Sequence, residues 1–291
     1  MEKMLRCVLL FILLSIINVS AKAQTVYYTD EDRERFEQYL SFIESKRLSS
    51  VEDLLIETGI FFLNTPYVAA TLEKEPEGLV VNLREMDCAT LVDNVLALVR
   101  TVRSEEPSFE TFCSNLKQLR YRNAEIGDYT DRLHYTTDWV YENSRKNLLR
   151  DVTKEIGGVP FDVNLSFMST HPDSYKQLKE NPKRIALMKD KEQEINKRVY
   201  YYIPEIQIEK IRSNIQNGDI ICFTTTIKGL DISHVGIAYW VGGKLTFIHA
   251  STTAMKVIIN EDSLVDYIGK IKRNNGIIVV RPSFLSENSI K

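Results

Sequence analysis

The chain has 291 residues, of which 37 are Lys or Arg and 40 are Asp or Glu, so its formal net charge at pH 7 is −3. A mildly acidic chain without a block of basic residues argues against nucleic acid as a partner. The length is sufficient for a large buried core, and no internal repeat or low-complexity linker divides the sequence. We therefore expect one catalytic or binding domain rather than several.

Residues 1–23 have the pattern of a secretory signal peptide. Two basic residues precede the apolar run 8–17, and Ala21-Lys22-Ala23 has the small-x-small form of a cleavage site. The apolar run is short for a membrane span, and Cys7 precedes it, a poor position for a lipoprotein anchor. We expect an exported protein of residues 24–291, periplasmic or extracellular, without a stable membrane anchor.

Helical patterns come first after this segment. Residues 24–60 are predicted to be a helical N-terminal elaboration, because apolar residues recur there at the spacing of one helical face: Phe36, Tyr39, Leu40 and Ile43. A second apolar run begins at Val51, and Gly59 is expected to end that helix. The stretch 79–83 is strand-like and leads to the next helix.

A buried helix is predicted to begin at Cys88. Apolar residues recur at three- and four-residue steps after the polar residue Asp87: Leu91, Val92, Val95, Leu96, Val99 and Val102. Asp87 suits the N-cap position, and free backbone N–H groups in the first turn favour negative charge. That position can lower the pKa of a thiol, although the Asp87 carboxylate opposes the effect. The alternative is that Cys88 is a small buried hydrophobic residue.

Three cysteines remain after the signal segment, so at least one thiol is expected to be free in an oxidising compartment. Cys113 falls in a predicted helix, 109–119, and Cys222 in an apolar strand, so both are interpreted as structural. A disulfide from Cys88 to either one would remove its chemistry. No CxxC or HxxxH spacing suggests a metal site, and we expect neither metal nor cofactor.

Two segments in the middle of the chain lack a strong period. Residues 128–139 are dense in aromatic and hydrogen-bonding side chains, which suits a wall facing a ligand. A surface loop anchored on the core by Trp139 is the alternative. Residues 171–198, rich in Lys and Glu and bounded by Pro172 and Pro182, are predicted to be a charged helical insertion without chemistry.

From Tyr200 onward the period changes to two, which is typical of strands. The predicted strands are residues 200–203, 219–224, 233–240, 244–250, 255–260 and 276–281. A helical half followed by a run of strands predicts an α+β fold, with the two halves forming two layers of one domain.

The sequence predicts that His234 and His249 lie together on a hairpin. If Val241-Gly242 is a two-residue turn, the two histidines stand directly opposite each other. If Gly242-Gly243 is the turn, His234 faces Ser251 and His249 is its diagonal neighbour. A three-residue loop without a bulge would place the histidines on opposite faces.

A cysteine nucleophile needs a base close in space and a third group that orients the base. Two histidines on one sheet face can fill these roles, because one accepts the thiol proton while the other fixes its tautomer. The alternative is that one histidine caps a strand and the other is a satisfied, half-buried side chain.

Five motifs follow one another from about residue 60 to the C-terminus: Pro66-Tyr67, Asp87-Cys88-Ala89-Thr90-Leu91, Gly218-Asp219-Ile220-Ile221-Cys222-Phe223, Ser233-His234-Val235-Gly236-Ile237 and Phe247-Ile248-His249-Ala250-Ser251. In order and spacing they resemble the NlpC-type superfamily of papain-like cell-wall hydrolases. The resemblance implies a papain-like core, in which the nucleophile helix packs on an antiparallel β-sheet or half-barrel. Ala89-Thr90 stands where Ser-Gly is usual, and a glycine pair after Tyr67 is missing, so ordinary dipeptide-length specificity is in doubt.

The resemblance implies a role for each matching position. Cys88 would be the nucleophile, His234 the general base and His249 the orienting third member, with Tyr67 near the thiol as an oxyanion or substrate contact. Beside these residues, Asp87 and Ser233 are candidate substrate contacts. An aromatic ring can stack on a pyranose and an arginine can bind a carboxylate through two hydrogen bonds, so four further candidates for the sugar and carboxylate side are Arg132, His134, Tyr135 and Trp139.

The segment 132–135, the charged insertion and residues 267–281 resemble one subfamily, described as N-acetylmuramoyl-L-alanine amidase-like. The implied reaction is cleavage of the amide between N-acetylmuramic acid, with the 1,6-anhydro form as one variant, and L-alanine in peptidoglycan or muropeptides. One alternative is an endopeptidase that cuts within the stem peptide. Another is a muropeptide-binding module that performs no chemistry.

Overall fold

The computed structural model describes residues 25–283, so the predicted signal peptide 1–23 lies outside the described residues. The strand-rich half forms an eight-stranded sheet in the order β4-β5-β10-β6-β7-β8-β9, with β3 paired to β10. All of its pairings are antiparallel. Its strands are β3 (Leu149–Asp151), β4 (Val159–Phe161), β5 (Tyr200–Pro204), β6 (Ile220–Thr225), β7 (Ile232–Val241), β8 (Lys244–Ser251), β9 (Lys256–Ile259) and β10 (Asn274–Pro282).

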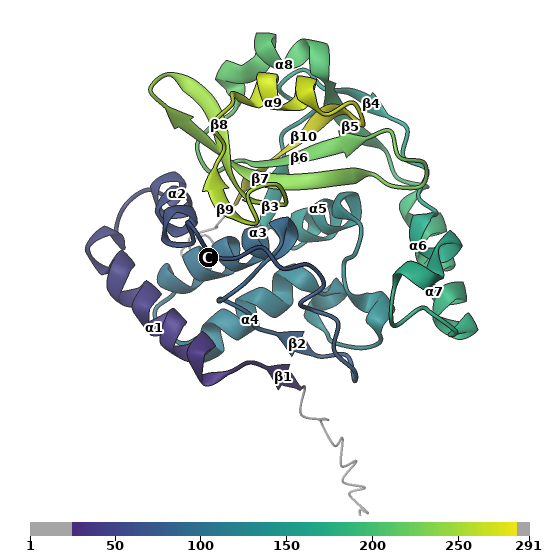
Figure 1. The fold of residues 1–291 in the computed structure, drawn as a ribbon, viewed down its shortest axis with the longest axis horizontal. Helices are drawn as coiled ribbons and strands as arrows, with labels where there is room; N and C mark the ends of the chain where they lie inside the picture. Colours follow the sequence, from purple (N-terminus) through teal and green to yellow (C-terminus); the bar gives the residue numbers. More distant parts are fainter. Residues whose placement is uncertain (1–24, 284–291) are drawn as a thin grey trace, which may run out of the picture.

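The helical half lies against one face of this sheet (Figure 1). Its helices are α1 (Asp30–Ile43), α2 (Val51–Phe61), α3 (Cys88–Val102), α4 (Phe109–Arg120) and α5 (Thr136–Arg145). A small parallel pair accompanies them, formed by β1 (Val26–Tyr27) and β2 (Leu79–Val80). The helices and the antiparallel sheet together confirm the predicted mixed α+β class. Within residues 25–283, no helix combines the length and apolar character needed to cross a membrane.

The main hydrophobic core lies between helix α3 and the sheet. Helix α3 has buried apolar side chains along most of its length and packs on β7 and β8. On β6, Ile220 and Cys222 face this core, whereas the alternate residues Ile221 and Phe223 face a second core. The sheet is therefore buried on both faces, which explains why its central strands are almost continuously apolar.

Two short helices cover the second face, so the predicted two layers become three. They are α8 (Glu205–Ile211) and α9 (Leu264–Lys270), and they contribute Ile208, Ile211, Leu264 and Ile268 to the second core. Figure 1 shows both on the side of the sheet away from α3. Seven residues make fewer than two helical turns, so their sequences carry no clear helical period.

The charged insertion forms a separate small lobe, at the right of Figure 1. Its helix α7 (Pro182–Ile195) packs on α6 (Phe167–Thr170), which directly precedes the insertion and belongs to the same lobe. A third apolar cluster joins the lobe to the segment before α5 through Tyr129, Tyr135 and Met168, among others. Short 3-10 turns complete the chain: η1 (Glu44–Lys46), η2 (Arg122–Ala124), η3 (Tyr129–Asp131), η4 (Pro172–Ser174) and η5 (Arg212–Asn214).

The expectation that Gly59 ends its helix is wrong, because α2 continues to Phe61. A Cβ atom at Gly59 would lie 2.8 Å from the Cδ1 atom of Ile248 on β8. The glycine therefore allows α2 to approach the sheet closely, and it does not act as a helix stop signal.

Candidate active site

Helix α3 begins at Cys88 with a complete capping box. The Asp87 Oδ1 atom accepts a hydrogen bond from the Thr90 backbone N–H at 2.8 Å. The Thr90 hydroxyl in turn accepts one from the Asp87 backbone N–H at 2.9 Å. This reciprocal pair fixes the path of the chain into the helix, so the half-buried Cys88 thiol is held in the first turn.

The hairpin that carries the two histidines has the second of the two predicted registers. Val241 pairs with Lys244, so the turn is Gly242-Gly243, and both glycines have the positive φ angles, 55° and 78°, that such a turn requires. His249 is therefore the diagonal neighbour of His234. The His234 Nε2 atom lies 2.7 Å from the His249 Nδ1 atom, a hydrogen bond between the two rings. The prediction that the imidazoles lie together is confirmed.

Burial keeps both imidazoles neutral at pH 7. Phe223, Phe247 and Tyr267 surround the pair, with ring centroids 4.6 to 5.8 Å from the nearer histidine. Burial, with added repulsion from His249 and Arg273, lowers the pKa of His234 to about 3. Burial lowers the pKa of His249 to about 4, and the nearby Asn260 side chain opposes that shift. A neutral His234 can accept a proton.

The pKa of the Cys88 thiol is raised to about 12, mainly by burial and then by the Asp87 carboxylate. Hydrogen bonds from the backbone of Val235, Ala89 and Cys88 itself lower it, but they do not outweigh burial. The thiol-activating effect expected of the helix start is therefore overcome in this structure. Both the thiol and the imidazoles are neutral, so a thiolate has to form by proton transfer during a reaction.

Cys88 opens into a cavity of about 900 Å³ that it shares with four other predicted site residues, Tyr67, Ser233, His234 and His249. The Ser233 hydroxyl donates to the Asn274 Oδ1 atom at 2.7 Å, so it ties the start of β7 to β10. The cavity thus brings together residues from four separate parts of the chain.

Tyr67 is held beside the helix start by main-chain contacts. It forms a parallel bridge with Met86, and its N–H donates to the Met255 carbonyl oxygen at 3.0 Å. Burial, then the nearby Cys88 and Asp87, raises the pKa of its hydroxyl. Tyr67 is therefore a neutral hydrogen-bond donor close to the thiol.

Tyr267 on α9 also lines this cavity, although it was not among the site residues predicted from the sequence. Its ring lies edge-on to His249, at 5.8 Å between centroids, and 6.4 Å from His234. Burial, then the proximity of Cys88, raises its pKa to about 12. The sequence contains no local indication of this position, because α9 reaches the site only through the tertiary fold.

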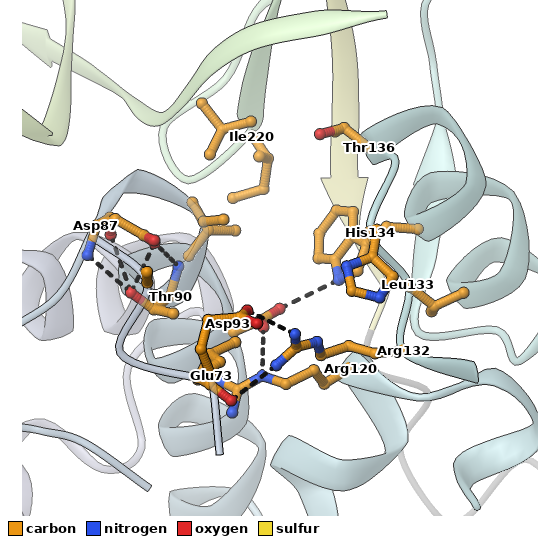
Figure 2. A pocket seen from close by; sticks show the side chains of 16 residues that line it. Glu73, Asp87, Thr90, Asp93, Arg120, Arg132, Leu133, His134, Thr136 and Ile220 are labelled. Carbon is orange, nitrogen blue, oxygen red and sulfur yellow. Dashed lines mark hydrogen bonds and ion pairs between the residues drawn. The ribbon is translucent and has the colours of Figure 1, made fainter. Parts of the chain in front are cut away.

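A second cavity, of about 170 Å³, lies on the other side of the α3 start and is lined there by Asp87, Ala89 and Thr90 (Figure 2). Besides Asp87, three of the residues predicted to bind substrate line it, namely Arg132, His134 and Trp139. These three residues come from the segment before α5 and from its first turns. The two cavities therefore flank the helix start on which Cys88 sits.

The three predicted residues of this second cavity, Arg132, His134 and Trp139, already have internal hydrogen-bond partners. Arg132 donates to the Leu72 carbonyl at 2.9 Å and to Glu73 at 2.6 Å, a contact visible in Figure 2. The Trp139 indole donates to Asp93 at 3.1 Å. The Nε2 atom of His134 lies 2.8 Å from the Tyr129 carbonyl oxygen. Burial and then the charge of Arg132 lower the pKa of His134 to about 3.

Tyr135, which the sequence assigned to the same wall, lines neither cavity. Its hydroxyl donates to Glu192 on α7 at 2.6 Å and accepts from the Met168 N–H at 2.9 Å. Glu192 belongs to the charged insertion and Met168 to α6 just before it, so Tyr135 anchors that lobe to the segment before α5.

The described cysteines and possible metal ligands bear on two alternatives, a disulfide and a metal site. Cys88, Cys113 and Cys222 are all free thiols, so no disulfide blocks Cys88. Among residues 25–283, no group of three or more His, Cys, Asp or Glu side chains could hold a metal ion.

A family model and several solved structures resemble this chain. Residues 57–277 match the family model described as N-acetylmuramoyl-L-alanine amidase-like. An N-acetylmuramoyl-L-alanine amidase from Bacteroides uniformis is 38% identical, with a TM-score of 0.78, over 80% of this chain and 99% of that structure. A Bacteroides fragilis protein named as a xylanase is 39% identical, with a TM-score of 0.74, over 77% of this chain and 98% of its own.

A Legionella pneumophila protein at 23% identity shares the fold, with a TM-score of 0.65 over 88% of this chain and 95% of its own. No curated protein sequence matches this chain.

Proposed function

This chain belongs to the N-acetylmuramoyl-L-alanine amidase-like family, and we propose that it is a cysteine-dependent amidase of peptidoglycan fragments. The scissile bond would be the amide between the lactyl group of N-acetylmuramic acid, including the 1,6-anhydro form, and L-alanine. One observation carries the proposal: Cys88 shares a cavity with the half-buried His234 and the buried His249, whose rings are hydrogen-bonded at 2.7 Å.

In the first half of the proposed reaction, the Cys88 sulfur attacks the lactyl carbonyl carbon while its proton passes to His234. His249 engages the Nε2 atom of His234, so the Nδ1 atom is the one that accepts the proton. The carbonyl oxygen becomes an oxyanion, which backbone N–H groups at the helix start and the Tyr67 hydroxyl can stabilise. His234 then donates its proton to the L-alanine nitrogen, the C–N bond breaks, and a thioester remains.

In the second half, a water molecule gives a proton to His234 and its oxygen attacks the thioester carbon. The C–S bond breaks, the muramic acid carboxyl group leaves, and the proton returns to the Cys88 sulfur. General acid and base assistance of this kind contributes about 10²–10⁴-fold to the rate. The neutral thiol and neutral imidazole of the free protein are suitable starting states, because each cycle restores both.

The proposal extends to the fold and location. Helix α3 packed on β7 and β8 supports a papain-like core of the NlpC type. The segment 1–23 supports export to the periplasm or beyond the cell, where peptidoglycan fragments are available.

The xylanase name of one structural relative prompts a comparison with glycosidase chemistry. Glycoside hydrolysis generally uses two carboxyl groups that flank the bond, about 5 to 9.5 Å apart. The acidic residues lining the larger cavity are the chain neighbours Glu261 and Asp262, and Asp262 is ion-paired with Lys270 at 2.7 Å. Cys88 and the histidines suit acyl transfer better than glycoside hydrolysis.

Mass spectrometry of digested muropeptides tests the proposal. We expect release of a peptide that begins with L-alanine together with a sugar that carries a free lactyl carboxylate. Products cut within the stem peptide would support the endopeptidase alternative instead. The Cys88→Ala variant should bind muropeptides but release no product, whereas equal turnover by this variant would contradict a cysteine mechanism. Binding without turnover by the parent protein would identify a binding module.

A further inference from the structure

One cation of the larger cavity is free of internal partners. Arg273 lines this cavity together with Cys88, His234 and His249, and its side chain is exposed. Within residues 25–283, its guanidinium group forms no hydrogen bond and no ion pair. The other two cations of the cavity are engaged, because Lys256 donates to Asn64 at 2.9 Å and Lys270 pairs with Asp262.

The backbone at Arg273 is fixed even though the side chain is free. Its carbonyl oxygen accepts hydrogen bonds from the Thr226 N–H at 2.8 Å and from the Thr225 hydroxyl at 3.1 Å. The next residue, Asn274, begins strand β10. The side chain therefore projects into the cavity from a fixed position of the backbone.

The smaller cavity differs in its electrostatics. Its two arginines already have carboxylate partners, Arg132 with Glu73 at 2.6 Å and Arg120 with Asp93 at 3.0 Å (Figure 2). Asp87 and Glu77 lie close by, so carboxylates outnumber cations in this region. A substrate carboxylate would be repelled there, and the role that the sequence suggested for Arg132 is better served by Arg273.

The position of Arg273 relative to His234 indicates which half of a substrate it meets. Arg273, His234 and Tyr267 line the same cavity, and the charge of Arg273 acts on both other side chains. In the proposed reaction His234 protonates the leaving amine, so the groups near His234 face the leaving peptide. A peptide that begins with L-alanine and continues with an acidic residue carries a carboxylate on this side.

We propose that Arg273 binds a carboxylate of the leaving stem peptide and so selects peptides with a free acid, rather than an amide, at the residue after L-alanine. This inference rests on the proposed amidase function. An arginine pairs with a carboxylate through two charge-assisted hydrogen bonds, and it loses that pairing when the acid becomes a carboxamide.

Two muropeptides that differ only at this residue test the inference: one with D-glutamate and one with D-isoglutamine. We expect Arg273→Gln to raise KM for the D-glutamate substrate about tenfold, the effect of one lost charge-assisted contact, and to change KM for the D-isoglutamine substrate less than about twofold. Arg273→Lys should retain part of the preference, because it keeps the charge but not the paired donors. Lys272 is an exposed neighbour that lies outside the cavity, so Lys272→Gln is the matched control. It should leave KM for both substrates unchanged.

Equal effects of Arg273→Gln on the two substrates would overturn the inference, as would a parent enzyme without preference for the acid. If Arg273→Gln acted only by changing the pKa of His234, cleavage of both substrates would change alike. A difference in KM between the two substrates therefore reports the contact between Arg273 and the carboxylate. If the parent protein cleaved neither substrate, the proposed function would fail. Binding of dipeptides, measured by calorimetry, would then still test the Arg273 contact. The Cys88→Ala variant should bind the dipeptide L-alanyl-D-glutamate more tightly than L-alanyl-D-isoglutamine, and equal affinities would reject the Arg273 contact.

Discussion

The His234 Nε2 atom and the His249 Nδ1 atom lie 2.7 Å apart on adjacent strands, so one histidine controls the protonation of the other. When the Nε2 atom of His234 donates the proton of this hydrogen bond, its Nδ1 atom is left unprotonated. When His249 donates instead, the Nδ1 atom of His234 carries the proton and cannot act as a base. The catalytic competence of His234 in the proposed reaction therefore depends on His249.

Replacing His249 tests this dependence. We expect His249→Ala to lower kcat by about 10²-fold or more, since the base loses the group that fixes its tautomer, with KM changed less than about twofold. His249→Gln retains a side chain that can form hydrogen bonds and should recover part of the loss. The control is His171→Ala, which removes an exposed histidine that stacks on Phe167 in the lobe. A rise in KM without a fall in kcat would place His249 in substrate binding instead.

The reactivity of Cys88 should follow its raised pKa. A thiol with a pKa of about 12 is almost fully protonated at pH 7, so alkylation by iodoacetamide should accelerate steadily from pH 7 to pH 10. Mass spectrometry of the labelled peptide measures the rate at Cys88 separately from that at Cys113. A rate that is already constant between pH 5 and pH 8 would reveal a preformed thiolate and imidazolium pair, contrary to this expectation.

The lowered pKa values of His234 and His249 should make stability depend on pH. Their folded pKa values, about 3 for His234 and about 4 for His249, lie below the value of about 6.5 for an exposed histidine. The unfolded chain therefore binds more protons in this window, and the free energy of unfolding should fall as the pH drops from about 6.5 towards 3. At about 1.4 kcal/mol per pKa unit, shifts of this size add up to several kcal/mol for the pair.

Urea unfolding at several pH values between 7.5 and 4 measures this dependence. In the double variant His234→Gln, His249→Gln the dependence should become shallower without disappearing, because His134 also has a pKa lowered to about 3. A double variant with the same pH dependence as the parent would show that the two histidines do not contribute to it.

The features that the sequence predicted correctly depend on neighbours within one or two elements. Asp87 and Thr90 are three residues apart, so the cap of α3 could be inferred locally. The two glycines at the hairpin limited the register to a few choices, and two of them brought the histidines together. The structure selected the Gly242-Gly243 turn among those choices.

The features that the sequence did not reveal depend on contacts between distant segments. Arg132 resembled a free carboxylate ligand until its partner Glu73, 59 residues away, became visible. Tyr135 resembled a sugar-stacking residue, but its partner is Glu192 on α7. Tyr267 and Arg273 reach the site through α9 and the start of β10, and no periodic pattern marks them. Burial also reversed the expected direction of the Cys88 pKa, which depends on the whole fold rather than on the helix start.

The buried ion pair between Asp93 and Arg120 should be important for stability. The two side chains are joined at 3.0 Å inside the protein, and Trp139 donates to the same carboxylate. Asp93→Ala leaves a buried guanidinium without its anion, so we expect the free energy of unfolding to fall by about 3–5 kcal/mol. The exposed pair Arg33–Glu110 is the control, and Glu110→Ala should cost less than about 1 kcal/mol. Similar losses in the two variants, measured by urea unfolding, would argue against this assignment.

Asp87 has two opposing effects on Cys88, and a single substitution can separate them. The carboxylate caps α3 through its Oδ1 atom, and its charge raises the pKa of the thiol. Asp87→Asn retains an acceptor for the Thr90 N–H but removes the charge, so the helix should remain capped while the pKa of Cys88 falls. Asp87→Ala removes both, so the pKa should also fall while the protein loses about 1 kcal/mol of stability with the cap.

The rate of iodoacetamide labelling at pH 8 and the urea midpoint report the two effects separately. We expect faster labelling of Cys88 in both variants, with a lower urea midpoint only in Asp87→Ala. If Asp87→Asn labelled Cys88 no faster than the parent protein, burial alone would hold the thiol protonated, and the charge of Asp87 would have no measurable part in setting its reactivity.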